Sequence, residues 1–97
     1  MTARLDETIH QTTRLRIMAV LTATRPDASV GFVALRDVLG TTDGNLGAHL
    51  RKLEEAGYVA VTKTFVGRKP QTFVIATDAG RRAFSAHTAA LREILGG

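Results

Sequence analysis

One stretch of the chain limits its fold more than any other: the run TTDGNLGAHLRKLEEAGYV at residues 41–59. Three leucines in it recur at helical spacing and form one narrow apolar stripe, namely Leu46, Leu50 and Leu53. Thr42 is suited to cap the first turn of this helix, and Gly57 is suited to end it. The run therefore predicts a helix with one buried side, followed by a strand that begins at Tyr58.

The segments on either side predict a helix-turn-helix with a wing. Residues 32–39 read as a short amphipathic helix, and the pair Gly40-Thr41 is a tight connection into the longer helix. Downstream, residues 59–64 and 72–75 are rich in Val, Phe and Thr and predict two strands. The basic loop at residues 65–71 contains Gly and Pro, which favour a turn. Two strands that close on a basic loop directly after such a helix indicate a wing.

The combined motif resembles a known family. The runs TTDGNLGAHLRKLEEAGYV, KTFVGRKPQTF and ATDAGRRAF are similar to those of small winged helix-turn-helix transcriptional regulators of bacteria and archaea, the compact MarR-like group. The resemblance extends from about Ile9 to Phe84. It implies a dimeric DNA-binding protein whose second motif helix enters the major groove while the wing touches the flanking backbone.

Composition limits the class of protein. A chain of 97 residues is sufficient for one small domain, which buries a modest fraction of its surface and gains from oligomerisation. Lys and Arg number 13 against 9 Asp and Glu, and this net charge of +4 favours polyanionic partners. The absence of cysteine excludes disulfides and thiolate metal sites. Without a signal peptide or a long apolar run, the protein is expected to be cytoplasmic.

The remaining segments complete a mainly α fold with a small β-hairpin wing (α+β). A first turn or two at residues 5–9 precedes a helix that Thr12 or Thr13 is suited to cap. Residues 25–29 are a loop, and Val30-Gly31 is a candidate third strand. We expect a single winged helix domain over residues 1–97, with the recognition helix at about 42–56, the wing at about 59–75 and a C-terminal helix at about 78–95.

Eleven residues are the candidates for DNA contact, on the outer face of the recognition helix and on the wing: Thr42, Asp43, Gly44, Asn45, Ala48, His49, Lys52, Lys63, Arg68, Lys69 and Gln71. Asn45 is suited to pair with adenine and His49 to donate to guanine, whereas the lysines suit phosphates. Arg51 lies nearer the flank of the helix and ranks lower. A polar outer face is also the default for any soluble helix, so the adjacent wing is what favours DNA.

Three residues of the recognition helix need a separate explanation. Asp43 is unfavourable beside DNA, although it can accept a bond from cytosine or stabilise the positive helix end. Gly44 and Gly47 each cost on the order of 1 kcal/mol relative to alanine inside a helix. Close approach of the helix backbone to DNA or to the preceding short helix would offset that cost, and the sequence leaves both explanations open.

The C-terminal helix carries an apolar stripe that is long for a terminal helix. We expect its far half to meet a second copy of the chain, together with the N-terminal segment, through Leu5, Ile9, Phe84, His87, Leu91, Ile94 and Leu95. The alternative packs the whole stripe along its own domain.

Other functions find less support. The sequence has no phosphate-binding glycine loop, no GxSxG and no His-Glu cluster, so an enzyme is not expected. No cofactor or metal is expected either, because His10, His49 and His87 are widely spaced, with a dimer-interface site at His87 as the remaining option. A winged helix that binds a protein instead of DNA is the main alternative. A further one is a regulator whose dimer groove, lined by Leu5, Ile9, Phe84 and Leu91, binds a small-molecule effector.

Overall fold

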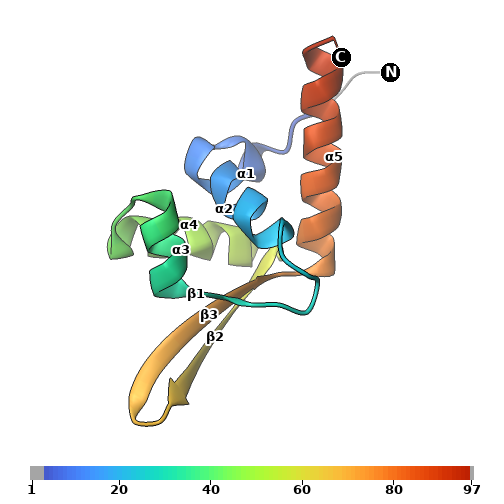
Figure 1. The fold of residues 1–97 in the computed structure, drawn as a ribbon. Helices are drawn as coiled ribbons and strands as arrows, with labels where there is room; N and C mark the ends of the chain where they lie inside the picture. Colours follow the sequence, from blue (N-terminus) through green and yellow to red (C-terminus); the bar gives the residue numbers. More distant parts are fainter. Residues whose placement is uncertain (1–3, 97) are drawn as a thin grey trace.

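The computed structural model describes residues 4–96 as an elongated winged helix fold of five helices and a three-stranded antiparallel sheet (Figure 1). In chain order the elements are α1 (Glu7–His10), α2 (Thr12–Thr22), β1 (Val30–Gly31), α3 (Phe32–Leu39), α4 (Asp43–Glu55), β2 (Val59–Val66), β3 (Lys69–Ala76) and α5 (Asp78–Ile94). Within the described residues, no helix is long and apolar enough to cross a membrane.

The helix-turn-helix consists of α3 and α4, joined through Gly40. Gly40 adopts the left-handed conformation, with φ 64°, that glycine enters without a steric penalty. The α4 leucines Leu46, Leu50 and Leu53 are all buried. They belong to one core that holds the two motif helices against α2 and the base of the sheet, and its buried members are Ile9, Ile17, Met18, Leu21, Leu35, Leu39, Leu46, Leu50, Leu53, Val59, Val74 and Ala76.

Side-chain caps fix where most of the helices begin. Thr42 accepts a hydrogen bond from the backbone N–H of Asn45, as predicted, and Thr77 accepts one from Gly80 at the start of α5. The predicted cap of α2 is wrong. Thr12 is already helical, and the side chain of Gln11 accepts from the N–H of Arg14 because the short α1 ends directly before it.

The sheet has the order β1-β3-β2, so the two residues of β1 are indeed a third strand. Strands β2 and β3 pair over their whole length, from Val59 opposite Ala76 to Val66 opposite Lys69. The predicted loop at residues 65–71 is therefore too long. Only Gly67 and Arg68 form the turn. Gly67 occupies the first central position of the turn with φ 65°, a conformation that suits a tight hairpin.

Helix α5 stands upright beside the helical body, and its C-terminal end projects away from the wing (Figure 1). Its first turn lies against the backbone of Tyr58, where an added Cβ at Gly80 would come within 2.0 Å of the Tyr58 carbonyl oxygen. Only glycine fits there. Further along, His87 and Ala90 are buried, whereas Ile94 is 56% and Leu95 82% exposed.

Candidate nucleic-acid interface

The outer face of α4 is exposed and polar. Gly44, Asn45, Ala48 and Lys52 are all exposed, and the side-chain Nδ2 of Asn45 donates to Thr41 Oγ1 at 2.9 Å. This bond orients the amide of Asn45 without covering it. The amide keeps a second N–H and its carbonyl oxygen, which are the two groups that recognise an adenine edge.

The charge of Asp43 is partly offset within the motif. Arg36 of α3 donates to the Asp43 carboxylate at 2.7 Å and to that of Asp37 at 3.0 Å. The hydrogen bond with Asp43, followed by that with Asp37, raises the pKa of Arg36 above its ordinary value. Asp43 therefore links the two helices of the motif, and Arg36, which it shares with Asp37, offsets part of its negative charge. The sequence prediction missed Arg36, although a cation seven positions before Asp43 across a tight turn was a usable signal.

His49 is half-buried on the side of α4 that faces α2. Arg14 Nη1 lies 3.2 Å from His49 Nδ1, and a guanidinium only donates, so Nδ1 accepts and the neutral ring carries its proton on Nε2. Burial, and then the positive charge of Arg14, lower the pKa of His49 below 6.5. At neutral pH the ring is therefore an uncharged Nε2–H donor. Arg14, which also donates to the carbonyl of Thr8, positions it.

The structure separates the two explanations for the α4 glycines. An added Cβ at Gly44 would meet nothing within 4 Å, and one at Gly47 would meet only the flexible end of Arg51, at 3.9 Å. Neither glycine is therefore required by contact with α3. The remaining explanation lies on the outer surface of α4. Because neither glycine has a side chain, the helix backbone there is open to close approach by an external ligand.

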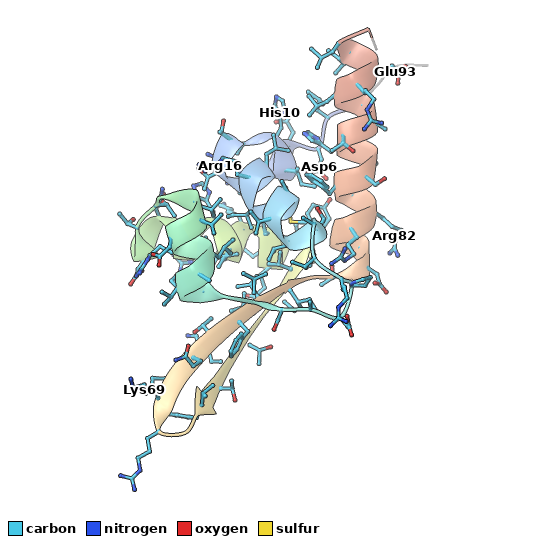
Figure 2. All side chains as sticks on the ribbon, viewed as in Figure 1. Asp6, His10, Arg16, Lys69, Arg82 and Glu93 are labelled. Atoms are coloured by element: carbon cyan, nitrogen blue, oxygen red, sulfur yellow. The ribbon has the colours of Figure 1, made fainter. Side chains whose placement is uncertain are left out.

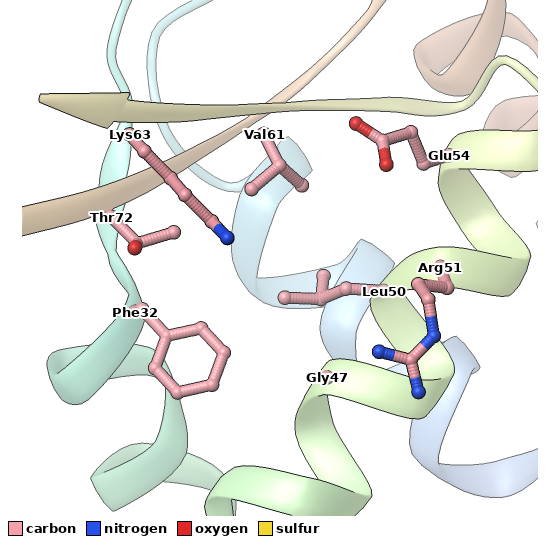
Figure 3. Close-up of a pocket in the computed structure, with 8 residues that line it drawn as sticks. All are labelled: Phe32, Gly47, Leu50, Arg51, Glu54, Val61, Lys63 and Thr72. Carbon is pink, nitrogen blue, oxygen red and sulfur yellow. The ribbon is translucent and has the colours of Figure 1, made fainter.

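A hollow of about 460 Å³ separates α4 from the wing (Figure 3). Lys63 points into it from β2, and Arg51 lies on its α4 side. The remaining lining residues are Phe32, Gly47, Leu50, Glu54, Val61 and Thr72. Arg51, which ranked low from the sequence, is thus an exposed cation beside Gly47. This position depends on how the wing packs beside α4, which the helical pattern of the sequence does not specify.

The wing carries a further group of cations, separate from those on α4. Lys63, Arg68 and Lys69 are exposed and Gln71 is half-buried, and Figure 2 shows Lys69 at the end of the hairpin, far from the helices. Between Glu55 and Asp78 the chain has no acidic residue. The local potential of the wing is therefore positive, which favours an anionic partner.

The residues predicted to meet a second copy fall into two groups. Ile94 and Leu95 are exposed and Leu5, Phe84 and Leu91 are half-buried, so these side chains are accessible on α5 and the segment beside it. Ile9 and His87 are each at most 1% exposed and are covered by their own chain. Their role in the isolated chain is to hold α1 against α5, because Ile9 belongs to the core and His87 Nδ1 accepts from the Asp6 N–H at 3.0 Å.

The environment of His87 also involves Tyr58, which directly precedes strand β2. The hydroxyl of Tyr58 donates to Asp6 Oδ2 at 2.6 Å, and this bond is the first cause of the raised pKa of Tyr58. Burial, and then the charge of His10, lower the pKa of His87, whereas Asp6 acts in the opposite direction. Among the described residues no group of three His, Cys, Asp or Glu is placed to hold a metal ion.

A helix-turn-helix whose second helix is exposed beside a basic β-hairpin defines a winged helix DNA-binding protein. The chain belongs to this family: the winged helix DNA-binding domain matches residues 13–95. Its fold is that of the MarR-type transcriptional regulators, as the sequence resemblance implied.

Two solved structures and one curated protein are similar to this chain. A transcriptional regulator homologue from Pyrococcus horikoshii OT3 is 32% identical, with a TM-score of 0.85 over 95% of this chain and 88% of that one. The S. aureus MepR–DNA complex is 17% identical and shares the fold, with a TM-score of 0.73 over 93% of this chain and 74% of that one. An uncharacterized protein of Methanocaldococcus jannaschii is 43% identical over 53 residues, which span 55% of this chain and 58% of that protein.

Proposed function

We propose that this chain is one domain of a homodimeric transcriptional regulator that binds specific sites in double-stranded DNA. Helix α4 enters the major groove, and the wing contacts the flanking backbone. The observation that carries the proposal is the surface of α4 itself. Its outer face has open space at two glycines and is bordered by cations on α4 and on the wing.

The hollow between α4 and the wing suits the sugar-phosphate strand that separates a major groove from the neighbouring minor groove. Arg51 and Lys63 belong to its opposite sides, so a phosphate in the hollow would meet two cations. The single acidic side chain in its lining, Glu54, reduces the attraction without reversing it. Lys52, Arg68 and Lys69 add phosphate contacts on either side.

Sequence recognition is assigned to the α4 face. Asn45, oriented by Thr41, reads a base edge through its amide, and neutral His49 donates from Nε2. Thr42 and Asp43 are assigned to the helix start, where Thr42 caps the first turn and Asp43 pairs with Arg36. Gln71 of the wing is assigned to a phosphate or a minor-groove edge.

Dimerisation is proposed through the projecting end of α5. Leu91, Ile94 and Leu95 present apolar surface there, with Leu5 and Phe84 nearer the body. Two copies related by a twofold axis would place two α4 helices on successive major grooves of a palindromic site. The small-molecule effector suggested by the sequence stays a prediction.

The test is the salt dependence of binding to random-sequence duplex DNA, followed by fluorescence anisotropy. The double variant Arg68→Ala/Lys69→Ala should weaken binding on any sequence and flatten the slope of log affinity against log salt by up to about two units, slightly under one per phosphate contact. The matched control is Arg25→Ala/Arg82→Ala, which removes the same charge from exposed positions outside α4 and the wing.

Equal loss of slope in the two double variants would mean that only net charge matters and that the wing has no special role. Absence of wild-type binding even at low salt would favour the alternative in which this winged helix binds a protein partner.

A further inference from the structure

The end of the wing carries an apolar pair that the fold does not use. Phe65 is 71% exposed, and its cross-strand partner Pro70 is exposed as well. The chain has four Phe and one Tyr, and the other four aromatic side chains are all half-buried. Phe65 is thus the one Phe or Tyr side chain that is exposed to solvent.

The alternation of side chains along the hairpin decides which way this pair faces. Val61 and Lys63 line the hollow beside α4, and successive side chains of a strand point to opposite faces. Phe65 therefore follows Val61 and Lys63 on the face of the sheet turned to α4. Val66, which is 60% exposed, lies on the opposite face. The Phe65–Pro70 pair therefore lies beyond the hollow, on the face of the wing that is turned to α4. Val66 lies on the other face.

Charge and shape at the tip favour a nucleic-acid groove. Lys63, Arg68 and Lys69 bracket the pair, and a two-residue turn at Gly67 keeps the end of the hairpin narrow. Phosphate contacts by themselves require the cations and not an exposed phenyl ring. Proteins that enter the minor groove insert apolar side chains, Phe and Pro among them, between base steps and kink the duplex.

We infer that the wing tip enters the minor groove beside the recognition site and inserts Phe65, supported by Pro70, against a base step. Lys63, Arg68 and Lys69 hold the phosphates on either side of it. The inference rests on the proposed DNA binding and adds a mode of recognition to it. Because pyrimidine–purine steps such as TA and CA unstack most easily, the wing gives the protein a preference at flanking positions that α4 does not read.

The test is selection of preferred duplexes from a random pool by the wild type, Phe65→Ala and Val66→Ala. The wild type should enrich pyrimidine–purine steps at a fixed distance outside the positions read by α4. Phe65→Ala should keep the central positions and lose the flanking ones, with a flank preference reduced on the order of tenfold, the size of a typical single base-pair effect. Val66→Ala removes a similarly exposed side chain from the opposite face and should keep both.

A second measurement reports the geometry of the DNA. On the selected duplex with 2-aminopurine at the flanking step, wild type and Phe65→Leu should raise the fluorescence by unstacking the base, and Phe65→Ala should not. Equal flank preference and equal unstacking in wild type and Phe65→Ala would overturn the inference while leaving DNA binding intact. A pool from which the wild type enriches nothing would overturn the proposed function itself, and the inference with it.

Discussion

At the scale of single residues, side chains on the surface of α4 are oriented by hydrogen bonds with residues outside that helix. Arg36 bonds Asp43, Thr41 orients Asn45, and Arg14 fixes the tautomer of His49. The sequence identified the side chains on the face but none of these partners. Arg14 lies 35 positions from His49, and such a contact exists only once α2 and α4 pack together. The same limit applies to His87 and Asp6, which lie 81 positions apart.

The half-buried ring of His49 and the buried ring of His87 predict a pH dependence of stability. The pKa values of both His49 and His87 are lowered in the folded protein, so the unfolded chain takes up protons first as the pH falls below 6.5. The free energy of unfolding should therefore decrease from about pH 7.5 to about pH 5.5, with the loss continuing toward the folded pKa values. Urea unfolding at the two pH values measures it.

His87→Asn separates the contribution of that ring. Asparagine Oδ1 can still accept from the Asp6 N–H but does not titrate, so the variant should lose less stability than the wild type over the same pH interval. The groups that face His87 are His10 and Asp6, and both remain in the variant. An identical loss in the two proteins would show that His87 does not contribute.

At the scale of elements, local pattern predicted most of the fold. The leucine period placed α4, Gly40 and Gly57 marked helix ends, and β-rich runs placed the wing strands. The tip of the wing was misjudged as a loop at residues 65–71, because Gly and Pro there suggested irregular backbone. Pro70 is tolerated inside the paired strand near the end of the hairpin. The consequence is functional, since strand pairing is what fixes the face on which Phe65 lies.

The glycines of α4 give a prediction with opposite signs for folding and binding. Gly44→Ala and Gly47→Ala should each stabilise the fold, by up to about 1 kcal/mol, because an added Cβ meets open space or a flexible side chain. Both should weaken DNA binding, because the methyl groups stand between the helix backbone and the groove. Chemical denaturation and anisotropy titration of the same samples measure the two effects.

The matched control is Gly80→Ala, at a helical glycine that packs against the backbone of Tyr58. Its Cβ would come within 2.0 Å of a backbone oxygen, so the variant should lose about 3 kcal/mol or more of stability. If Gly44→Ala and Gly47→Ala gained stability and kept full DNA affinity, close approach of α4 to DNA would be the wrong explanation for these glycines.

At the scale of the whole molecule, α5 and the wing extend the chain in two directions from one small core. The principal extents are 53 × 25 × 22 Å, and Ile94 and Leu95 are exposed at the projecting end of α5. The sequence stripe predicted an interface along this helix. The stripe does not reveal that His87 and Ile9 are covered within the same chain. One apolar helix face can pack partly on its own core and partly on a second chain.

Ile94→Glu/Leu95→Glu should dissociate the proposed dimer without unfolding the domain, since both side chains are exposed in the single chain. DNA affinity should then fall on a two-half-site duplex, because two linked contacts become one. Sedimentation velocity measures the mass. Val33→Glu, at a side chain 53% exposed on α3, is the control and should stay dimeric. An unchanged mass in the double variant would exclude this end of α5 as the interface.

The measurement that tests the central claim most directly is an amide NMR titration of the labelled protein with duplex DNA. Binding through α4 and the wing predicts shift changes concentrated at residues 42–52 and 63–71, with the projecting half of α5 unaffected. Changes concentrated on α5 would place DNA on the wrong side of the molecule, and their absence throughout at low salt would contradict DNA binding by this domain.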